Sequence, residues 1–121
     1  MSAPDPTCLL FVQMTAKPEH EAEFNAWYEA EYIPAFVRDI PGIVRARRFA
    51  TLSPDGSGTH TYLTLYEFQD EAALHTGLDV MKSRDEWRKL WKTWEGKAVA
   101  SISDGLFRTT THVDGAAAST R

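Results

Sequence analysis

The order of the apolar segments, with the prolines and glycines between them, most limits how this chain can fold. Short apolar runs typical of β-strands occupy residues 8–15, 43–52 and 59–68, and a fourth strand is expected within residues 101–113. One helix-like region separates the first two strands, and another separates the last two. The sequence therefore predicts an α+β fold with the order β-α-β-β-α-β, the ferredoxin-like sandwich.

Local signals indicate where the first elements begin and end. Pro18 suits the first turn of a helix that is expected to run to about Tyr32. Pro34 disfavours helical geometry in the residue before it, so a break or kink is predicted at Ile33. The segment SPDGSG is a strong turn signal, and the second and third strands are therefore predicted to form a hairpin.

The second helical region is predicted to consist of two helices. Asp70 is expected to cap the first of them, which runs towards Met81. Residues 83–86, Ser-Arg-Asp-Glu, have the form of a capping box, so a further helix is expected to begin there and to end near Gly96. In the last strand Gly105 is a candidate bulge.

Composition indicates one globular domain without nucleic-acid or membrane partners. The chain has 121 residues, of which 43% are hydrophobic and 25% charged, which is enough for a core of its own. We expect a single domain over residues 1–121, with loose tails at residues 1–7 and 114–121. A net charge of −4 without a long basic run argues against nucleic acid, and the apolar run at residues 8–12 is too short to span a bilayer.

Cysteine usage favours a reducing compartment. Cys8 is the only cysteine, so no internal disulfide can form, and a cytoplasmic location is the default prediction. Cys8 lies in a strand-like run beside two leucines, which indicates a small buried hydrophobe; a catalytic thiol is the alternative.

The predicted sheet carries apolar side chains on both faces. In the third strand Tyr62, Tyr66 and Phe68 share one face, whereas Leu63 and Leu65 lie on the other. Helices can cover only one of these faces. Pairing of two sheets face to face in a homodimer would cover the other, and this is the predicted self-association. The alternative is a monomer with a solvated sheet face, which would expose both leucines.

A dense set of residues between positions 20 and 68 carries a family resemblance. The set comprises Phe24-Asn25, Trp27-Tyr28, Tyr32-Ile33-Pro34, Pro41-Gly42 and Ala46-Arg47-Arg48-Phe49. It resembles the EthD-like branch of the dimeric α/β-barrel superfamily, and the order of elements agrees with that superfamily to about residue 112. The resemblance implies a sheet-to-sheet dimer. It does not select a reaction, because the superfamily hosts isomerases, cyclases, lyases, cofactor-independent monooxygenases and haem enzymes.

Tyr32 departs from the family pattern. Relatives commonly have His directly before the Ile-Pro, and imidazole transfers protons readily near neutral pH. An unperturbed phenol titrates at about pH 10, which disfavours His-like chemistry at this position. Tyr32 is nevertheless a candidate catalytic residue, either as a hydrogen-bond donor to a substrate oxygen or, with a lowered pKa, as a base.

Aromatic residues supply the candidate pocket wall. The candidate substrate-binding residues are Trp27, Tyr28, Tyr62, Tyr66, Trp87 and Trp91. Tyr and Trp carry polar groups that need a partner when they are buried, and a ligand can supply one. The resemblance implies that ligands lie between the sheet and its own helices. The alternative is that these rings are ordinary core, which is the interpretation for Phe24.

Three arginines on the second strand are further candidates. Alternation places Arg45 and Arg47 on one face and Arg48 on the other. Structural ion pairs with Glu67 or Glu31 are one expectation. The other is that Arg48 holds a substrate carboxylate or an enolate and acts as a second catalytic residue.

The histidines have no metal-ligand spacing. His20, His60, His75 and His112 form no HxH or HxxxH pattern, so no metal site is predicted. No Gly-rich phosphate loop or Cys/His pair is present either. We therefore predict chemistry without a cofactor, and haem is the alternative that the resemblance leaves open.

These features together favour an enzyme that acts without a cofactor on an apolar, aromatic or polyketide-like carbonyl compound. Tyr32 or Arg48 would polarise the carbonyl or stabilise an enolate during isomerisation, cyclisation or lyase chemistry. A cofactor-independent monooxygenase is the alternative enzyme. A ligand-binding or structural dimer without catalysis is the alternative that is not an enzyme.

Overall fold

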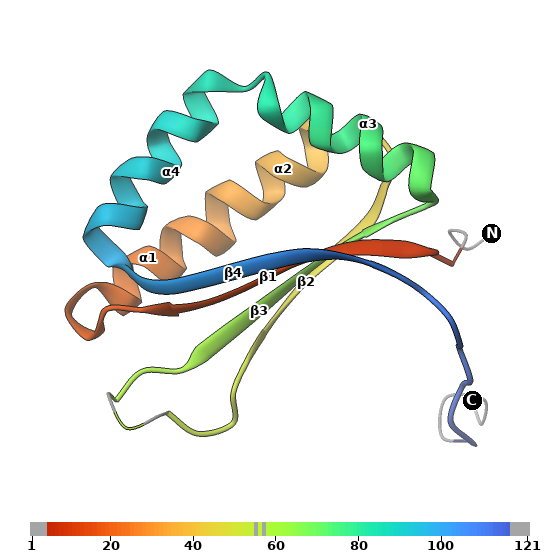
Figure 1. Cartoon of the computed structure of the whole chain (residues 1–121). Coiled ribbons are helices and arrows are strands. Elements are labelled where there is room, and N and C mark those ends of the chain that lie inside the picture. Colours follow the sequence, from red (N-terminus) through yellow and green to blue (C-terminus); the bar gives the residue numbers. More distant parts are fainter. Residues whose placement is uncertain (1–4, 55, 57, 117–121) are drawn as a thin grey trace.

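Four strands and the helices between them form two layers (Figure 1). The computed structural model describes residues 5–54, 56 and 58–116. The strands are β1 (Cys8–Ala16), β2 (Ile43–Ala50), β3 (Thr61–Phe68) and β4 (Val99–Arg108). All neighbouring strands are antiparallel, in the order β2-β3-β1-β4, and the helices cover one face of this sheet. The predicted α+β ferredoxin-like fold is confirmed.

The first helical region is continuous and changes helix type along its length. Its parts are the short η1 (Pro18–His20), α1 (Glu21–Trp27), the π-helical η2 (Tyr28–Tyr32) and α2 (Ile33–Asp39). The sequence predicts a break at Ile33, but Ile33 keeps helical dihedral angles, φ −60° and ψ −47°. Its amide donates to the carbonyl of Tyr28, five residues earlier. The wider π turn therefore carries the helix up to Pro34, whose missing amide falls in the first turn of α2.

The second helical region consists of α3 (Glu71–Lys82) and α4 (Asp85–Ala98). The predicted cap of α3 is confirmed, because the Asp70 carboxylate accepts a hydrogen bond of 2.8 Å from the amide of Ala73.

The predicted capping box before α4 is wrong in its details. The helix begins at the expected place, but the hydroxyl of Ser83 donates to the carbonyl of Val80, at 2.7 Å, and so stabilises the end of α3 instead. The predicted end at Gly96 is also wrong. Gly96 has no positive φ, so the backbone stays helical as far as Ala98.

Gly105 permits a close approach rather than a bulge. The register shift between β1 and β4 lies between Thr15 and Ala16, whereas Gly105 pairs regularly with Phe11. A Cβ atom on Gly105 would lie 2.7 Å from the Phe11 ring. That ring meets Phe107 edge-on, with centroids 5.2 Å apart. Glycine at this position makes room for an aromatic pair.

Part of the predicted loose tail at residues 1–7 is bound to the sheet. The Thr7 amide donates to the carbonyl of Phe68 at 3.1 Å, and the Thr7 carbonyl accepts from the amide of Thr109 at 2.8 Å. Backbone pairing therefore includes Thr7, the residue before β1. The prediction of a loose tail is wrong for this residue. Residues 1–4 and 117–121 of the predicted tails lie outside the described residues.

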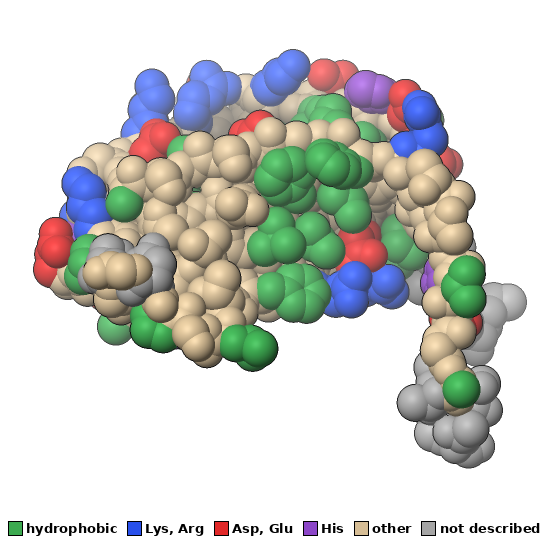
Figure 2. All heavy atoms as spheres, turned by 60° about the horizontal axis from the view of Figure 1, so that its bottom comes forward, with side chains coloured by type: hydrophobic (Ala, Val, Ile, Leu, Met, Phe, Trp, Pro, Cys, Tyr) green, Lys and Arg blue, Asp and Glu red, His purple; other side chains and the backbone are tan. Residues whose placement is uncertain are grey.

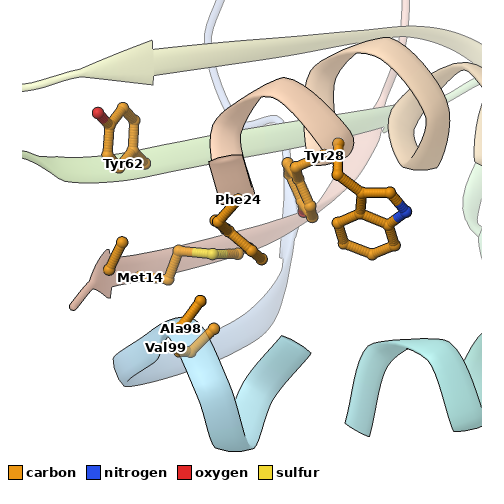
Figure 3. Close-up of a cluster of buried hydrophobic side chains, with 8 residues drawn as sticks. Met14, Phe24, Tyr28, Tyr62, Ala98 and Val99 are labelled. Carbon is orange, nitrogen blue, oxygen red and sulfur yellow. The ribbon is translucent and has the colours of Figure 1, made fainter. Parts of the chain in front are cut away.

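Two clusters of buried apolar side chains fill the space between the layers. The first, drawn in Figure 3, contains Met14, Ala16, Phe24, Trp27, Tyr28, Tyr62, Ala98 and Val99. The second contains Cys8, Leu10, Phe36, Ile40, Tyr66, Phe68 and Leu74. Val12, Tyr32 and Ile33 pack against both clusters, so the two clusters meet at the end of the π turn.

The opposite face of the sheet, here called the open face, has an apolar patch with no helix over it (Figure 2). Strand alternation and register place on this face Leu9, Phe11, Phe49, Leu63, Leu65 and Phe107. The predicted position of Leu63 and Leu65 is thereby confirmed.

Charged side chains adjoin this patch. Glu67, only 5% exposed, accepts hydrogen bonds from Arg45 at 3.1 Å and from Arg47 at 2.8 Å. The predicted ion pairs of Glu67 are confirmed, and the open face is therefore apolar with a paired acidic group near one edge.

Gly77 is the residue of α3 at which this helix packs closely on the core. A Cβ atom there would lie 2.7 Å from the Phe68 ring and 2.8 Å from the Ile40 side chain. We expect Gly77→Ala to lower the free energy of unfolding by about 1–3 kcal/mol, because overpacking outweighs the better helix propensity of alanine. Chemical denaturation measures this change.

Gly96→Ala is the matched control, because no atom lies within 4 Å of a Cβ atom at that helical position. This variant should be more stable by about 0.5–1 kcal/mol. Equal stabilisation by both substitutions would contradict the close packing of α3.

Candidate functional site

A cavity of about 400 Å³, here called the inner cavity, lies between the helices and the sheet. Its sheet side includes Leu10, Val12, Tyr66, Ile102, Asp104 and Leu106. Its helix side is formed by Tyr28, Tyr32, Phe36, Leu78, Met81 and Trp91. The volume is in the range of small-molecule sites, and the mainly apolar and aromatic wall suits a flat apolar ligand.

A row of four rings runs along the first helical region and supplies much of the helix side. Phe24, Tyr28, Tyr32 and Phe36 recur every four residues, with successive centroids 5.4, 5.1 and 5.9 Å apart. In a regular α-helix each four-residue step rotates the side chain by about 40°. Tyr28 and Tyr32, whose rings are 16° from parallel, lie at the two ends of the π turn, so the row continues across the change of helix type.

Two hydrogen-bonded phenols face one another across the inner cavity wall. The hydroxyl oxygens of Tyr28, on the helix, and Tyr66, on β3, are 3.1 Å apart. Burial raises the pKa of both groups, and the rise is larger for Tyr66. Both side chains therefore stay neutral. One hydroxyl donates to the other, and the buried Thr64 hydroxyl also interacts with that of Tyr28.

Tyr32 has an available donor. It lines the inner cavity, and no group within the part of the chain that the structure describes is hydrogen-bonded to its hydroxyl. Burial, followed by the neighbouring Tyr28, raises the pKa of Tyr32 well above its ordinary value. The base with a lowered pKa, one of the two roles predicted for Tyr32, is therefore contradicted. The hydrogen-bond donor stays a prediction.

Asp104 was not among the sequence-based candidates. It is the only carboxylate among the described residues that line the inner cavity. On β4 it pairs with Val12, and its neighbours on the same face are Ile102 and Leu106. A single acidic residue between two apolar residues at spacing two was the signal available in the sequence.

A second hollow of about 530 Å³, here called the outer hollow, adjoins the inner cavity. Tyr32, Met81 and Trp91 line both spaces. The outer hollow is completed by Lys82, Trp87 and Arg88. The structure thus brings Tyr28, Tyr32, Tyr66 and Trp91 to the inner cavity, and Trp87 only to the outer hollow.

Two predicted pocket residues belong to the core instead. Trp27 stacks on Trp94, with centroids 5.3 Å apart and planes 19° from parallel. The Tyr62 hydroxyl donates to Glu21 at 2.8 Å and accepts from Asn25 at 2.9 Å. Neither Trp27 nor Tyr62 lines the inner cavity or the outer hollow, because these contacts hold them at the far end of the first cluster.

Arg48 does not reach the inner cavity either. Its guanidinium, with the side chain 5% exposed, donates to Asn25 and to Glu29, both at 2.8 Å. Its Cζ lies 4.2 Å from the ring centroid of Tyr62 and 4.7 Å from that of Tyr28. The carboxylate partner is Glu29 rather than the predicted Glu31. The ion pair and the cation–π contacts hold Arg48 behind the ring of Tyr28, which it contacts. Arg48 lines neither the inner cavity nor the outer hollow.

Two other sequence predictions concern reactive or metal-binding groups. Cys8 is 5% exposed, and burial raises the pKa of its thiol, in agreement with a buried hydrophobe rather than a nucleophile. Within residues 5–54, 56 and 58–116, no three His, Cys, Asp or Glu side chains are grouped so that they could hold a metal ion. No helix in the same part of the chain is long and apolar enough to cross a membrane.

Comparison with known families gives one match. The model of the family described as "Domain of unknown function (DUF4286)" matches residues 7–102. Among curated proteins, none matches the sequence.

Solved structures with the same fold include two described as oxygenases. The monooxygenase of ActVA-Orf6 from Streptomyces coelicolor, in complex with nanaomycin D, has a TM-score of 0.67 at 10% identity, over 92% of this chain and 94% of that one. SnoaB from Streptomyces nogalater, a cofactor-independent oxygenase, has a TM-score of 0.59 at 16% identity, over 90% and 99%. A dimeric ferredoxin-like protein from an uncultured marine organism has a TM-score of 0.64 at 10% identity, over 90% and 100%. At these identities the likeness shows the shared fold.

The buried tyrosines make the stability of the fold depend on pH in the alkaline range. All four have a raised pKa in the folded state, with burial as the largest cause. In the unfolded chain they titrate at about pH 10, so the unfolded state loses protons first. The contribution of the neutral tyrosines to the stability of the fold is therefore complete below about pH 10. It is lost as the pH rises through the pKa values that the tyrosines have in the folded state.

We expect the free energy of unfolding to fall above about pH 10. The ultraviolet absorbance of phenolate should appear together with unfolding in an alkaline titration. A tyrosine that ionises well below this pH in the folded protein would contradict the buried, neutral phenols.

Proposed function

Because the chain belongs to the DUF4286 family, a domain family of unknown function, we propose its function from the inner cavity itself. The protein is an enzyme that moves a proton next to the carbonyl of a flat, largely apolar compound, aromatic or polyketide-like, without a cofactor. One observation carries the proposal: among the described residues, the apolar cavity of about 400 Å³ is lined by a single carboxylate, Asp104, and by a phenol without a protein partner, Tyr32.

The two groups have complementary roles. The Asp104 carboxylate accepts a proton from the carbon next to the carbonyl, and the Tyr32 hydroxyl donates a hydrogen bond to the oxygen as it becomes an enolate. The proton then returns from Asp104 to another carbon, which completes an isomerisation without a co-reactant. A cyclisation would begin with the same proton removal.

The wall of the inner cavity supports this chemistry in two ways. The parallel rings of Tyr28 and Tyr32 favour a flat ligand, whose faces can lie against aromatic groups. Apolar side chains on the helix side limit the competition of water for the hydrogen bond to a developing enolate, while the β4 side, with Asp104, is exposed to solvent.

A cofactor-independent monooxygenase is the second candidate, and the shared fold of the two Streptomyces oxygenases favours it. The same proton removal would produce a carbanion that reacts with dioxygen. Oxygen consumption in the presence of substrate distinguishes this reaction from isomerisation. Within the superfamily, the segments Ile33-Pro34 and Pro41-Gly42 support the EthD-like branch as the proposed affiliation, while Tyr32 departs from its pattern.

Aromatic ketones such as acetylnaphthalene and tetralone are the first compounds to test. At a hundred times its dissociation constant, a bound ketone should stabilise the fold by about 2.7 kcal/mol, which a thermal shift detects. Exchange of the proton next to the carbonyl for deuterium, followed by NMR in D₂O, then reports proton removal.

We expect Asp104→Asn to slow this exchange by about 10²–10⁴-fold while binding persists, because the amide cannot accept the proton. Tyr32→Phe should slow it by about 10²-fold through the loss of one donor to the enolate. Asp79→Asn, an exposed position on α3 outside both spaces, is the matched control. Binding without any exchange would contradict an enzyme and favour the non-catalytic ligand-binding dimer, and the absence of binding would contradict the site.

The open face supports the proposal that two copies pair through their sheets. None of the described residues covers the apolar patch of this face, and a dimeric ferredoxin-like protein has the same fold. Pairing through this face would leave the helix layer, with the inner cavity and the outer hollow, away from the interface.

Sedimentation measures this directly. The protein should have the mass of two chains, and Leu65→Arg should reduce it to the mass of one, because a further cation beside Arg47 would lose its water in the apolar interface. Leu90→Arg, on α4 where the leucine is 45% exposed, is the control and should remain a dimer. A native protein with the mass of one chain would refute the pairing.

A further inference from the structure

The outer hollow extends the site beyond the inner cavity. Tyr32, Met81 and Trp91 line both spaces, which therefore share one boundary. The inner cavity of about 400 Å³ has room for the flat part of a ligand, and a longer molecule would extend past these three side chains into the outer hollow. What the outer hollow can bind then decides which substituents a ligand can carry.

Two positively charged side chains, from two different helices, border the outer hollow. Lys82 lies in the last turn of α3, and Arg88 lies on the following helix, α4. Arg88 donates a hydrogen bond to the backbone carbonyl of Lys82, which fixes the guanidinium at the junction of the two helices. The remaining N–H groups of Arg88 are available to a ligand.

The nearby acidic groups do not neutralise both cations. Arg88 lies 3.7 Å from the carboxylate of Asp85, and Glu86 is 3.6 Å from a different cation, Arg84. Lys82 forms no ion pair with a carboxylate in the described ranges 5–54, 56 and 58–116. Two cations against one anion leave one positive charge at the outer hollow, on a chain whose net charge is −4.

We propose that the ligand carries a carboxylate that binds to Lys82 and Arg88 in the outer hollow, while its flat carbonyl-bearing part lies in the inner cavity. A single excess positive charge matches a carboxylate, which carries one negative charge, better than a phosphate monoester, which carries up to two. The substrate class is thus an aromatic or polyketide-like keto acid. This inference rests on the proposed function, because it places the ketone of that reaction in the inner cavity.

The test compares an acetylnaphthoic acid with its methyl ester, which has the same ring system and ketone but no charge. Quenching of tryptophan fluorescence measures both dissociation constants, since Trp87 and Trp91 line the outer hollow. For the native protein at low salt, the acid should bind up to about five-fold tighter than the ester, the size expected for a partly exposed ion pair. The preference should weaken as salt is added.

Lys82→Gln removes the unpaired cation without disturbing Arg88, which holds the end of α3. This variant should lose most of the preference for the acid while it binds the ester as the native protein does. Lys89→Gln is the matched control, because Lys89 is an exposed cation on α4 that lines neither space, and it should keep the preference.

Three other binding results would each overturn the inference, and they can be told apart. Equal binding of acid and ester, or a preference that Lys82→Gln leaves unchanged, refutes the carboxylate site and leaves the proposed function standing. Tighter binding of a naphthyl phosphate than of the acid refutes the carboxylate as the preferred anion. Failure of both the acid and the ester to bind refutes the proposed function, and this inference with it.

Discussion

The stacking of Tyr28 on Tyr32 across the π turn is the contact on which the rest of the site depends. It keeps four rings in a row along one helical region, and three of them, Tyr28, Tyr32 and Phe36, line the inner cavity. Trp91 of α4 packs against this row, with its centroid 5.9 Å from that of Tyr32. The four-residue spacing keeps the rings in one row both in α1, where Phe24 stacks on Tyr28, and across the π turn.

The polar groups near the row of rings are of two kinds: one is bound to other protein groups, and the others face the inner cavity. Arg48, behind Tyr28, donates from one nitrogen to Asn25 and to Glu29 and lies over two aromatic faces, and it supports the wall without lining it. Its other two guanidinium nitrogens are buried without a hydrogen-bond partner among the described residues. Tyr32 and Asp104 differ from it, because each lines the cavity itself. Among the described residues the Tyr32 phenol is partly buried without a protein partner, and this is the physical reason to assign it to a ligand. Asp104 is exposed and is assigned to the site by its position on the cavity wall.

The sequence is sufficient to predict the elements, their order and the facing of the strands, because period-two alternation and turn residues are local signals. The cap at Asp70 and the pairing of Glu67 with Arg45 and Arg47 follow from equally local rules. The π turn could not be predicted, because the proline rule considers only the residue before Pro34 and not a change of helix type one turn earlier. The roles of Arg48 and Asp104 depend on packing across elements: a helix covers Arg48, whereas a cavity remains in front of Asp104.

A crystal structure of the protein with bound acetylnaphthalene tests the central claim most directly. The account predicts the ring system in the inner cavity, against Tyr28 and Tyr32, with the ketone oxygen within hydrogen-bond distance of the Tyr32 hydroxyl. A structure in which Tyr32, Met81 and Trp91 close together and fill this space, with no ligand between the helices and the sheet, would contradict it.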